Sequence, residues 1–313
     1  MTNHQADSAD IPIVAFLPTP FTASDSVDQE RLCALARRVG RHGIRPAVLG
    51  GMGEFFALNL DEARDCMVAA VAGAEGSPVV AGIGFSTREA MALAAAAGEA
   101  GVSVLVVNPH YYAVPTPDGL AEHVRQVADV SGLPAIVYSS ATHPLTDRHV
   151  EALVAVPGFL GIKEEAYPLA EFERRVNAWG TRIEWWAVTE PVGMPFVRAG
   201  ASVVTSSMAS VSPGASRAFV EAELAGEGAG GDLAGFANAW EAFVAGAPEG
   251  APGALKAMLH AVDGWPLEVR GPLVPAGAAT LGRARDILAE YQALVGDAVQ
   301  APTPDDRAPS RTR

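Results

Sequence analysis

Lysine occupies only two of the 22 basic positions in this 313-residue chain, so each lysine is chemically informative. Lys163 ends the apolar, strand-like run FLGIK, and Lys256 lies in the helix-like stretch GALKAMLHAVDG. A desolvated lysine amine can lose its proton and attack a carbonyl carbon to form an imine, whereas a guanidinium stays charged and is not nucleophilic. Lys163 is therefore a candidate Schiff-base nucleophile, with an ion pair to Glu164 or Glu165 as the alternative. Lys256 is predicted to lie on a helix surface, its stem covering apolar neighbours.

A repeating pattern of strands and helices would position this nucleophile. From Ile11 to about Ala225, β-type runs alternate with Ala-rich amphipathic stretches, which is the rhythm of βα units. The predicted strands are Ile13–Leu17, Ala47–Gly50, Val79–Ile83, Val102–Val107, Ala135–Tyr138, Leu160–Lys163, Glu184–Val188 and Ser202–Thr205. Predicted helices between them include Asp28–His42, Leu60–Ala74, Thr87–Ala100 and Gly119–Val130. Several strands are apolar throughout, as expected of parallel strands covered on both faces.

Eight such units favour a closed (β/α)8 barrel, a TIM barrel of the α/β class, with its site at the C-terminal ends of the strands. An open doubly wound sheet is the alternative, but no GxGxxG follows the first strand. We expect a flexible N-terminus at 1–10, the barrel at 11–225, a C-terminal helical region at 226–297 and a disordered tail at 298–313. The helices predicted in the C-terminal region are Leu233–Ala245, Gly253–Val262 and Ala276–Leu294.

Charge and composition exclude two classes of partner. The formal net charge of −14 and pI of about 4.9 repel nucleic acid and anionic membranes at long range. The N-terminal segment has no apolar signal core, and no uncharged apolar run reaches the roughly 18 residues of a membrane span. Cys33 and Cys66 form no CxxC pair, and the histidines show no metal-ligand spacing. We therefore expect a cytoplasmic protein that binds a small-molecule substrate, with no metal and no organic cofactor.

Five short motifs, in this order and spacing, resemble the dihydrodipicolinate synthase/N-acetylneuraminate lyase family of class I aldolases and dehydratases. They are PTPF (Pro18–Phe21), GGMGE (Gly50–Glu54), NPHYY (Asn108–Tyr112), VYSS (Val137–Ser140) and GIKE (Gly161–Glu164). The resemblance covers about Pro12 to Leu294. It implies a barrel with a C-terminal helical region that assembles as a homo-oligomer, a dimer or a tetramer.

Carried over by position, the resemblance gives roles to three side chains. Lys163 matches the Schiff-base lysine, Tyr138 the proton-relay tyrosine, and Tyr112 the tyrosine that one subunit lends to its neighbour. A phenol held by hydrogen bonds can accept and return the proton that imine chemistry moves. An ordinary buried aromatic is the alternative for Tyr138, and interface packing is the alternative for Tyr111 and Tyr112. His110 is expected to be structural.

The turn after the second strand departs from the family pattern. The resemblance places two hydroxyl residues there, which hold the substrate carboxylate and extend the proton relay, but this chain has Gly51 and Met52. Methionine donates no hydrogen bond, so anion binding at this turn would depend on backbone N–H groups. Gly50, Gly53 and Glu54 are retained, so we expect the shape of the turn to survive, with Glu54 holding the loop.

Two other segments, GEFFAL in the same turn and TSSMASVSP (Thr205–Pro213), look like the 5-dehydro-4-deoxyglucarate dehydratase branch. In that branch a serine of the second segment helps to position the substrate. Ser206 and Ser207 are therefore candidate ligands, with small residues closing a barrel turn as the alternative.

Three further positions are candidates for substrate selection. His143 is the nearest match to an arginine by which the family's synthases bind a distal carboxylate; it could bind an anion or lie in a solvated loop. Thr189 and Glu190 lie where family members select the variable end of the substrate. Glu190 would disfavour a second carboxylate there.

These residues predict a lyase that acts on a small 2-oxo acid or related carbonyl compound through an imine on Lys163. The lyase would be either a dehydratase or an aldolase. Tyr138 would move a proton as a bond β to the imine carbon breaks, with the imine as electron sink. The branch resemblance favours dehydration over aldol cleavage. The alternative is a non-catalytic barrel that binds carbonyl compounds or acids and has lost the hydroxyl pair. A metal-dependent aldolase has the least support.

Overall fold

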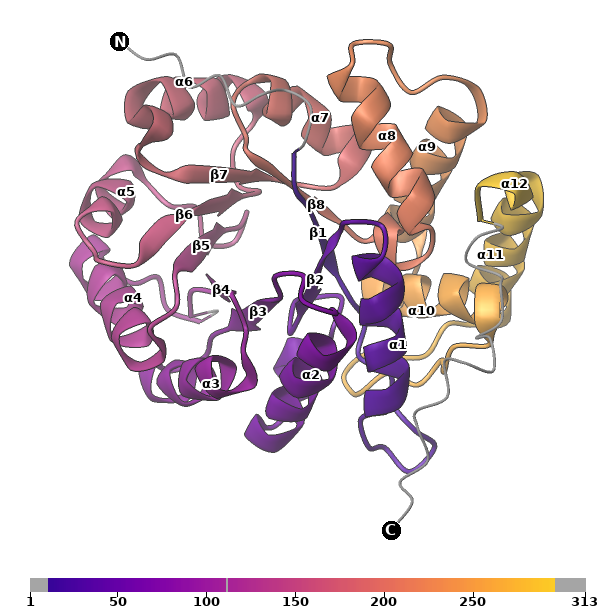
Figure 1. The fold of residues 1–313 in the computed structure, drawn as a ribbon, viewed down its shortest axis with the longest axis horizontal. Helices are drawn as coiled ribbons and strands as arrows, with labels where there is room; N and C mark the ends of the chain where they lie inside the picture. Colours follow the sequence, from indigo (N-terminus) through magenta and orange to yellow (C-terminus); the bar gives the residue numbers. More distant parts are fainter. Residues whose placement is uncertain (1–10, 111, 296–313) are drawn as a thin grey trace.

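Eight parallel strands close into a barrel at the centre of the computed structural model, which describes residues 11–110 and 112–295 (Figure 1). The strands are β1 (Ile13–Phe16), β2 (Arg45–Val48), β3 (Val80–Ile83), β4 (Val104–Val107), β5 (Ala135–Ser139), β6 (Phe159–Glu164), β7 (Glu184–Ala187) and β8 (Val203–Ser206). Each strand pairs with the next in sequence, and β8 pairs with β1. The predicted (β/α)8 barrel is therefore confirmed.

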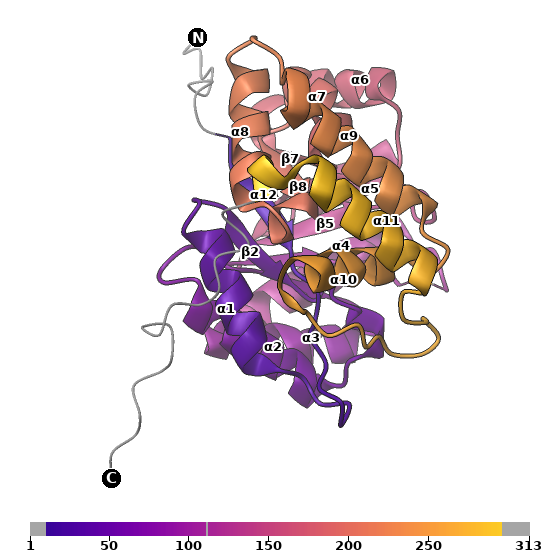
Figure 2. The same ribbon diagram turned by 90° about the vertical axis from the view of Figure 1, so that its right-hand side faces the viewer.

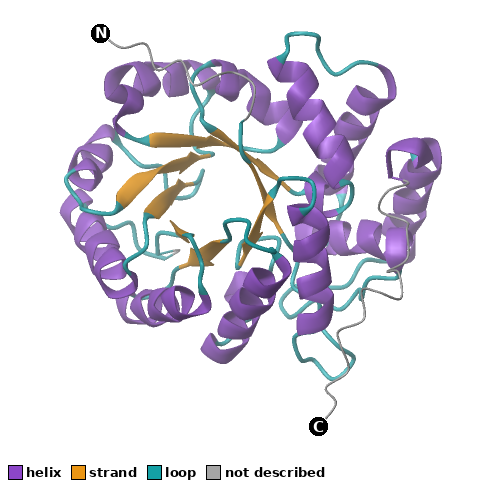
Figure 3. Ribbon diagram, viewed as in Figure 1, coloured by secondary structure: helices purple, strands orange, loops and turns teal. Residues whose placement is uncertain are grey.

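Helices surround the strands on the outside (Figure 3). They are α1 (Gln29–Gly40), α2 (Leu60–Gly73), α3 (Thr87–Ala100), α4 (Pro117–Ser131), α5 (Asp147–Val154), α6 (Leu169–Trp179), α7 (Glu190–Arg198) and α8 (Pro213–Leu224). Local sequence sets many of their ends: Asn59 and Ser86 begin α2 and α3 with capping boxes, and Gly101 and Gly132 end α3 and α4 in the left-handed conformation. Within the two described ranges, no helix is both long and apolar enough to cross a membrane.

Alternating strand residues divide the core into two layers. An inner layer fills the barrel, and the other face of each strand packs under the helices. The buried members of the inner layer are Val14, Ala47, Val80, Val106, Ile136, Trp186 and Val203. The inside of the barrel is therefore packed below its C-terminal rim, and chemistry is confined to the rim.

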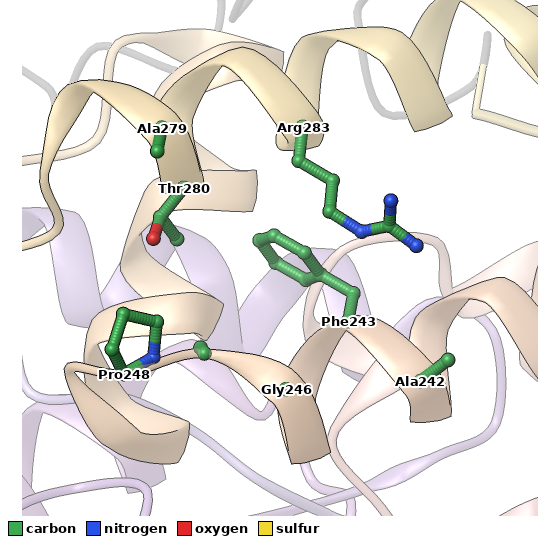
Figure 4. A pocket seen from close by; sticks show the side chains of 8 residues that line it. Ala242, Phe243, Gly246, Pro248, Ala279, Thr280 and Arg283 are labelled. Atoms are coloured by element: carbon green, nitrogen blue, oxygen red, sulfur yellow. The ribbon is translucent and has the colours of Figure 1, made fainter.

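The chain continues past the barrel as a helical region on one side of it (Figure 2). It contains α9 (Gly231–Gly246), α10 (Gly250–Asp263), α11 (Ala278–Glu290) and α12 (Gln292–Val295), and α9 packs on α7 and α8. Within this region a hollow of about 200 Å³ lies between α9 and α11, where Phe243 points towards Thr280 and Arg283 (Figure 4). Its lining contains no predicted site residue.

The prediction of a surface position for Lys256 is wrong. Its side chain is fully buried, and Nζ donates to Oε1 of Glu54 at 2.5 Å and to the carbonyl of Glu268 at 2.5 Å. Desolvation lowers the pKa of Lys256, and the facing carboxylate of Glu54 opposes that shift. A buried lysine is retained only with such a partner. The partner lies 202 positions away in the sequence, so helical periodicity alone could not indicate it.

Candidate active site

The amine of Lys163 lies at the C-terminal end of β6, on the inner side of the barrel. In the sheet register, Lys163 stands beside Tyr138 of β5 and Trp186 of β7. Paired residues of neighbouring strands point to the same face, and Trp186 belongs to the inner layer. The three side chains therefore face the barrel interior together, and only 10% of the Lys163 side chain is exposed.

Burial changes the charge of this amine. It lowers the pKa of Lys163 from 10.5 to about 7, against the opposing effect of the neighbouring Glu164. Glu164 itself points to the outer face of β6, where it accepts from Ser139 Oγ at 2.9 Å and from Arg175 at 2.8 Å. Near neutral pH roughly half of the Lys163 amines are therefore unprotonated, the form that attacks a carbonyl.

One carboxylate that the motifs do not single out, Glu165, contacts both reactive groups. Lys163 Nζ donates to Oε1, and Tyr138 Oη donates to Oε2 at 2.5 Å. The Glu165 N–H donates to the carbonyl of Ser139 at 2.8 Å and prolongs the β5–β6 ladder. The residue two positions after Lys163 consequently shares its face. The ion-pair alternative for Lys163 is thus observed, alongside the burial that a nucleophile requires.

Aromatic rings form part of the surroundings of the amine. Lys163 Nζ lies 4.4 Å from the ring centroid of Tyr138 and 5.8 Å from that of Phe16. The turn after β2 packs against Phe16 at Gly50, where a Cβ atom would fall 2.3 Å from Phe16 Cδ1. Glycine at this position therefore allows the turn to pack closely against Phe16, whose ring lies beside Lys163.

The backbone of the turn is unusual at both of its ends. Leu49 and Glu54 at its two ends both adopt left-handed φ angles, of 60° and 53°. The N–H of Gly53 donates to the Gly50 carbonyl, whereas no described residue accepts from the N–H groups of Gly51 and Met52. These two N–H groups are available to an anion. A Cβ at position 51 would meet no atom within 4 Å.

Buried contacts with the C-terminal region hold this turn. The carboxylate of Glu54 accepts from Lys256 through Oε1 and from the N–H of Arg270 at 2.8 Å through Oε2. Thr19 of the preceding loop donates to the carbonyl of Gly53 at 2.6 Å. Two left-handed non-glycine residues cost of order 1–3 kcal/mol each, so such anchoring is what keeps the turn in place.

Two predicted substrate ligands, Ser206 and Ser207, contact the outer helices instead of Lys163. Ser206 follows Thr205, which shares the register position of the inner-layer residue Val14, so Ser206 faces outwards. Its Oγ lies 3.5 Å from that of Ser216 on α8. Ser207 accepts from the indole N–H of Trp240 on α9 at 3.1 Å. Both serines are buried, which favours the alternative of small residues closing a turn.

Thr189 and Glu190 likewise contact α8 and α9. Thr189 donates to Glu241 at 2.6 Å, and Ser216 donates to Glu190 Oε1. Glu190 is fully buried at the start of α7, and burial raises its pKa to about 7 against the effect of the donating Ser206 and Ser216. The described contacts therefore fix both side chains in the layer outside the barrel.

His143 and Tyr112 lie on loops that follow β5 and β4. His143 is half-buried, forms a backbone bridge with Ser140, and its Nδ1 lies 3.2 Å from Thr142 Oγ1. Tyr112 is 87% exposed, and its N–H donates to Nδ1 of His110 at 3.2 Å, which gives that histidine a role in shaping the loop. Tyr111, for which interface packing is the alternative, lies outside the described residues.

The groups brought together at the rim are an amine, a phenol and a carboxylate. In the described ranges, 11–110 and 112–295, no group of three or more His, Cys, Asp or Glu is arranged to hold a metal ion. A buried amine of lowered pKa beside proton-accepting groups is the arrangement that imine chemistry requires.

The chain is similar to known proteins over most of its length. The model of the dihydrodipicolinate synthetase family matches residues 11–290. The 4-hydroxy-tetrahydrodipicolinate synthase 1 of Streptomyces coelicolor is 33% identical over 294 residues, covering 90% of this chain and 93% of its own. The probable 5-dehydro-4-deoxyglucarate dehydratase 2 of the same organism is 31% identical over 222 residues. These residues cover 69% of this chain and 68% of the dehydratase.

Two solved structures share the fold at lower sequence identity. The catalytic lysine mutant of Ruminococcus gnavus sialic acid aldolase has a TM-score of 0.82 at 16% identity. The match covers 94% of this chain and 100% of the aldolase chain. Dihydrodipicolinate synthase from Bacillus clausii has a TM-score of 0.80 at 22% identity. The match covers 90% of this chain and 97% of the synthase chain.

Proposed function

We propose that this chain, which belongs to the dihydrodipicolinate synthetase family, is a lyase that forms an imine between Lys163 and a small 2-oxo acid or closely related carbonyl compound. One observation carries the proposal: Lys163 is almost fully buried and faces the barrel interior at the rim, beside Tyr138, and this burial lowers its pKa to about 7. Such an amine is a nucleophile near neutral pH. The iminium formed from it withdraws electrons from the adjacent carbon.

The neighbouring groups divide the remaining tasks. In this proposal Tyr138 exchanges a proton with the substrate as a bond breaks, which its register position beside Lys163 supports. The N–H groups of Gly51 and Met52, from which no described residue accepts, bind the substrate carboxylate. Phe16 and Trp186 add apolar surface beside the amine, which excludes water from the imine.

Within this reaction class we favour dehydration, with or without decarboxylation, over aldol cleavage. Two observations support this choice. The chain is similar to the probable dehydratase of Streptomyces coelicolor. Its GEFFAL and TSSMASVSP segments also resemble the dehydratase branch of the family. Ser206 and Ser207 lend no weight to this choice, because their contacts are with α8 and α9.

Trapping of the imine tests the proposal. The purified chain is incubated with sodium borohydride and each member of a panel of 2-oxo acids and simple ketones, and the adduct is measured by intact mass. We expect one adduct per chain, absent in Lys163→Arg, which keeps the charge but not the nucleophile. Glu173→Gln, on the exposed face of α6, is the control and should still be trapped. Absence of a Lys163-dependent adduct with every compound would favour the non-catalytic binding barrel.

A second experiment tests the 2-oxo acid part of the proposal. Open space at position 51 allows a hydroxyl side chain, so Gly51→Thr combined with Met52→Thr should fold and add two donors beside the free N–H groups. We expect the double variant to bind pyruvate more tightly than the natural chain, as measured by the concentration that gives half-maximal trapping. An unchanged or weaker value would contradict carboxylate binding at this turn.

A further inference from the structure

We propose that Glu165 is a catalytic proton carrier, which transfers protons between the Lys163 amine, the Tyr138 phenol and the substrate. This role deepens the function proposed above and rests on imine formation at Lys163. It assigns a chemical task to a residue that neither the motifs nor the comparisons single out.

The contacts of Glu165 are those of a bridge. Its Oε1 accepts from Lys163 Nζ, and its Oε2 accepts from Tyr138 Oη at 2.5 Å. About a third of the side chain is open to the mouth of the barrel, at 30% exposure, whereas Lys163 beneath it is 10% exposed. One carboxylate thus touches the attacking nitrogen and the phenol, and it is also accessible to a substrate that enters from the rim.

The adjacent carboxylate cannot serve the same purpose. Glu164 faces outwards and is occupied by the guanidinium of Arg175, the hydroxyl of Ser139 and the N–H of Ala166. Its oxygens therefore stabilise the outer face of β6 and do not contact the amine. Two consecutive glutamates have opposite orientations because strand residues alternate between faces.

Tyr138 needs an acceptor for its own proton. Burial raises the pKa of this phenol, and the negative charge of Glu164 adds to the effect, so a free phenolate is unfavourable. In the described chain the acceptor that Tyr138 Oη contacts is Glu165, and Gly51 and Met52 of the nearby turn offer no hydroxyl. Tyr138 can take a proton from the substrate while it passes its own to Oε2, and it stays neutral throughout.

Proton balance during imine formation gives Glu165 a task at each step. Lys163 first gives one ammonium proton to Oε1; the free amine attacks the carbonyl carbon, and the carbonyl oxygen receives that proton from the carboxylic acid. The nitrogen then gives a second proton to Glu165, which delivers it to the hydroxyl as water leaves. The third proton stays on the iminium, and Glu165 returns to its carboxylate form. All three protons and the oxygen are accounted for without another reactant.

After imine formation the same carboxylate completes proton removal from the neighbouring carbon. The C–H electron pair forms the enamine double bond, the iminium electron pair returns to nitrogen, and the proton passes through Tyr138 to Oε2. The exchange of the methyl hydrogens of pyruvate with deuterated water measures this proton removal separately from any later bond cleavage. It requires no knowledge of the natural substrate.

The test compares Glu165→Gln with the natural chain, using pyruvate and hydroxyacetone as probes. The borohydride adduct at Lys163, measured by intact mass after equilibration, should persist in Glu165→Gln. The rate of methyl hydrogen exchange, followed by proton NMR in deuterated water, should fall by at least about 100-fold, the usual lower bound for loss of a general acid–base group. Glu165→Asp, which keeps a carboxylate, should recover part of the rate. Glu173→Gln on the exposed face of α6 is the matched control and should change nothing.

Three outcomes would overturn the proposal. Exchange at the natural rate in Glu165→Gln would show that the carboxylate moves no proton, and loss of the equilibrium adduct would show that it only positions Lys163. Equal rates in Glu165→Gln and Glu165→Asp would show that carboxylate chemistry is not involved. Absence of an adduct in the natural chain with either probe and with the whole panel is a separate result, because it refutes imine formation itself.

Discussion

Direct titration of Lys163 is the sharpest quantitative test of the site. Burial lowers the pKa of this amine to about 7, whereas an ordinary lysine titrates at 10.5. At pH 7 roughly half of the Lys163 amines should be neutral, against about 1 in 3,000 for an exposed lysine. The available nucleophile is therefore about a thousandfold more abundant than on an unperturbed side chain.

The composition of the chain makes the measurement simple. With only Lys163 and Lys256 present, a sample labelled with ¹³C at the lysine ε-carbon gives two side-chain signals. A Lys163→Met variant assigns them by removing one. We expect the Lys163 signal to move through its titration midpoint near pH 7 between pH 5 and pH 10. In Glu165→Gln the midpoint should shift lower, because removal of a negative charge beside the amine favours the neutral form.

Failure is as clearly defined as success. A Lys163 signal that keeps its ammonium position up to pH 9.5 would refute the reasoning, since the neighbouring carboxylates would then outweigh desolvation. A midpoint that rises in Glu165→Gln would contradict the assigned contact between the two side chains.

Three other predictions concern stability, each measured by urea denaturation. Lys256→Met leaves the buried carboxylate of Glu54 unpaired, so the free energy of unfolding should fall by about 3–5 kcal/mol. Gly50→Ala places a Cβ 2.3 Å from Phe16 Cδ1 and should cost about 1–3 kcal/mol. The same change should cost less when it is made in a Phe16→Ala variant, which has no ring at that place. Burial raises the pKa of Glu190 from 4.5 to about 7, so the folded state keeps a proton that the unfolded chain loses, and stability falls as pH rises through this range. Glu190→Gln should therefore match the natural chain near pH 4.5 and exceed it by about 3 kcal/mol at pH 8.

The apolar strands and the position of Lys163 at the barrel rim could be predicted because their signals are local. The runs AIVY and FLGIK predicted β5 and β6, and alternation along β6 would also have placed Glu165 on the face of Lys163. At β2 the predicted range, Ala47–Gly50, is two residues late. The strand ends at Val48 because Leu49 adopts a left-handed φ, which nothing in its residue type indicates.

Orientation and long-range partners could not be predicted in the same way. Ser206 stands next to Thr205 in sequence, but the register with β1 decides which of them faces the barrel interior. The helix of Lys256 is buried on nearly every side, so no polar face indicates where the lysine points. Its partner Glu54 becomes apparent only when the C-terminal helices are packed beside the barrel.

Two of the contacts of Glu54 can form only late in the synthesis of the chain. The turn beside the nucleophile is encoded within the first 55 residues, yet its anchors, Lys256 and the N–H of Arg270, follow 202 and 216 positions later. On a translating ribosome the barrel strands emerge well before these anchors do. A nascent chain therefore contains Lys163 long before these two contacts hold the turn, and a chain that terminates before Lys256 lacks both of them.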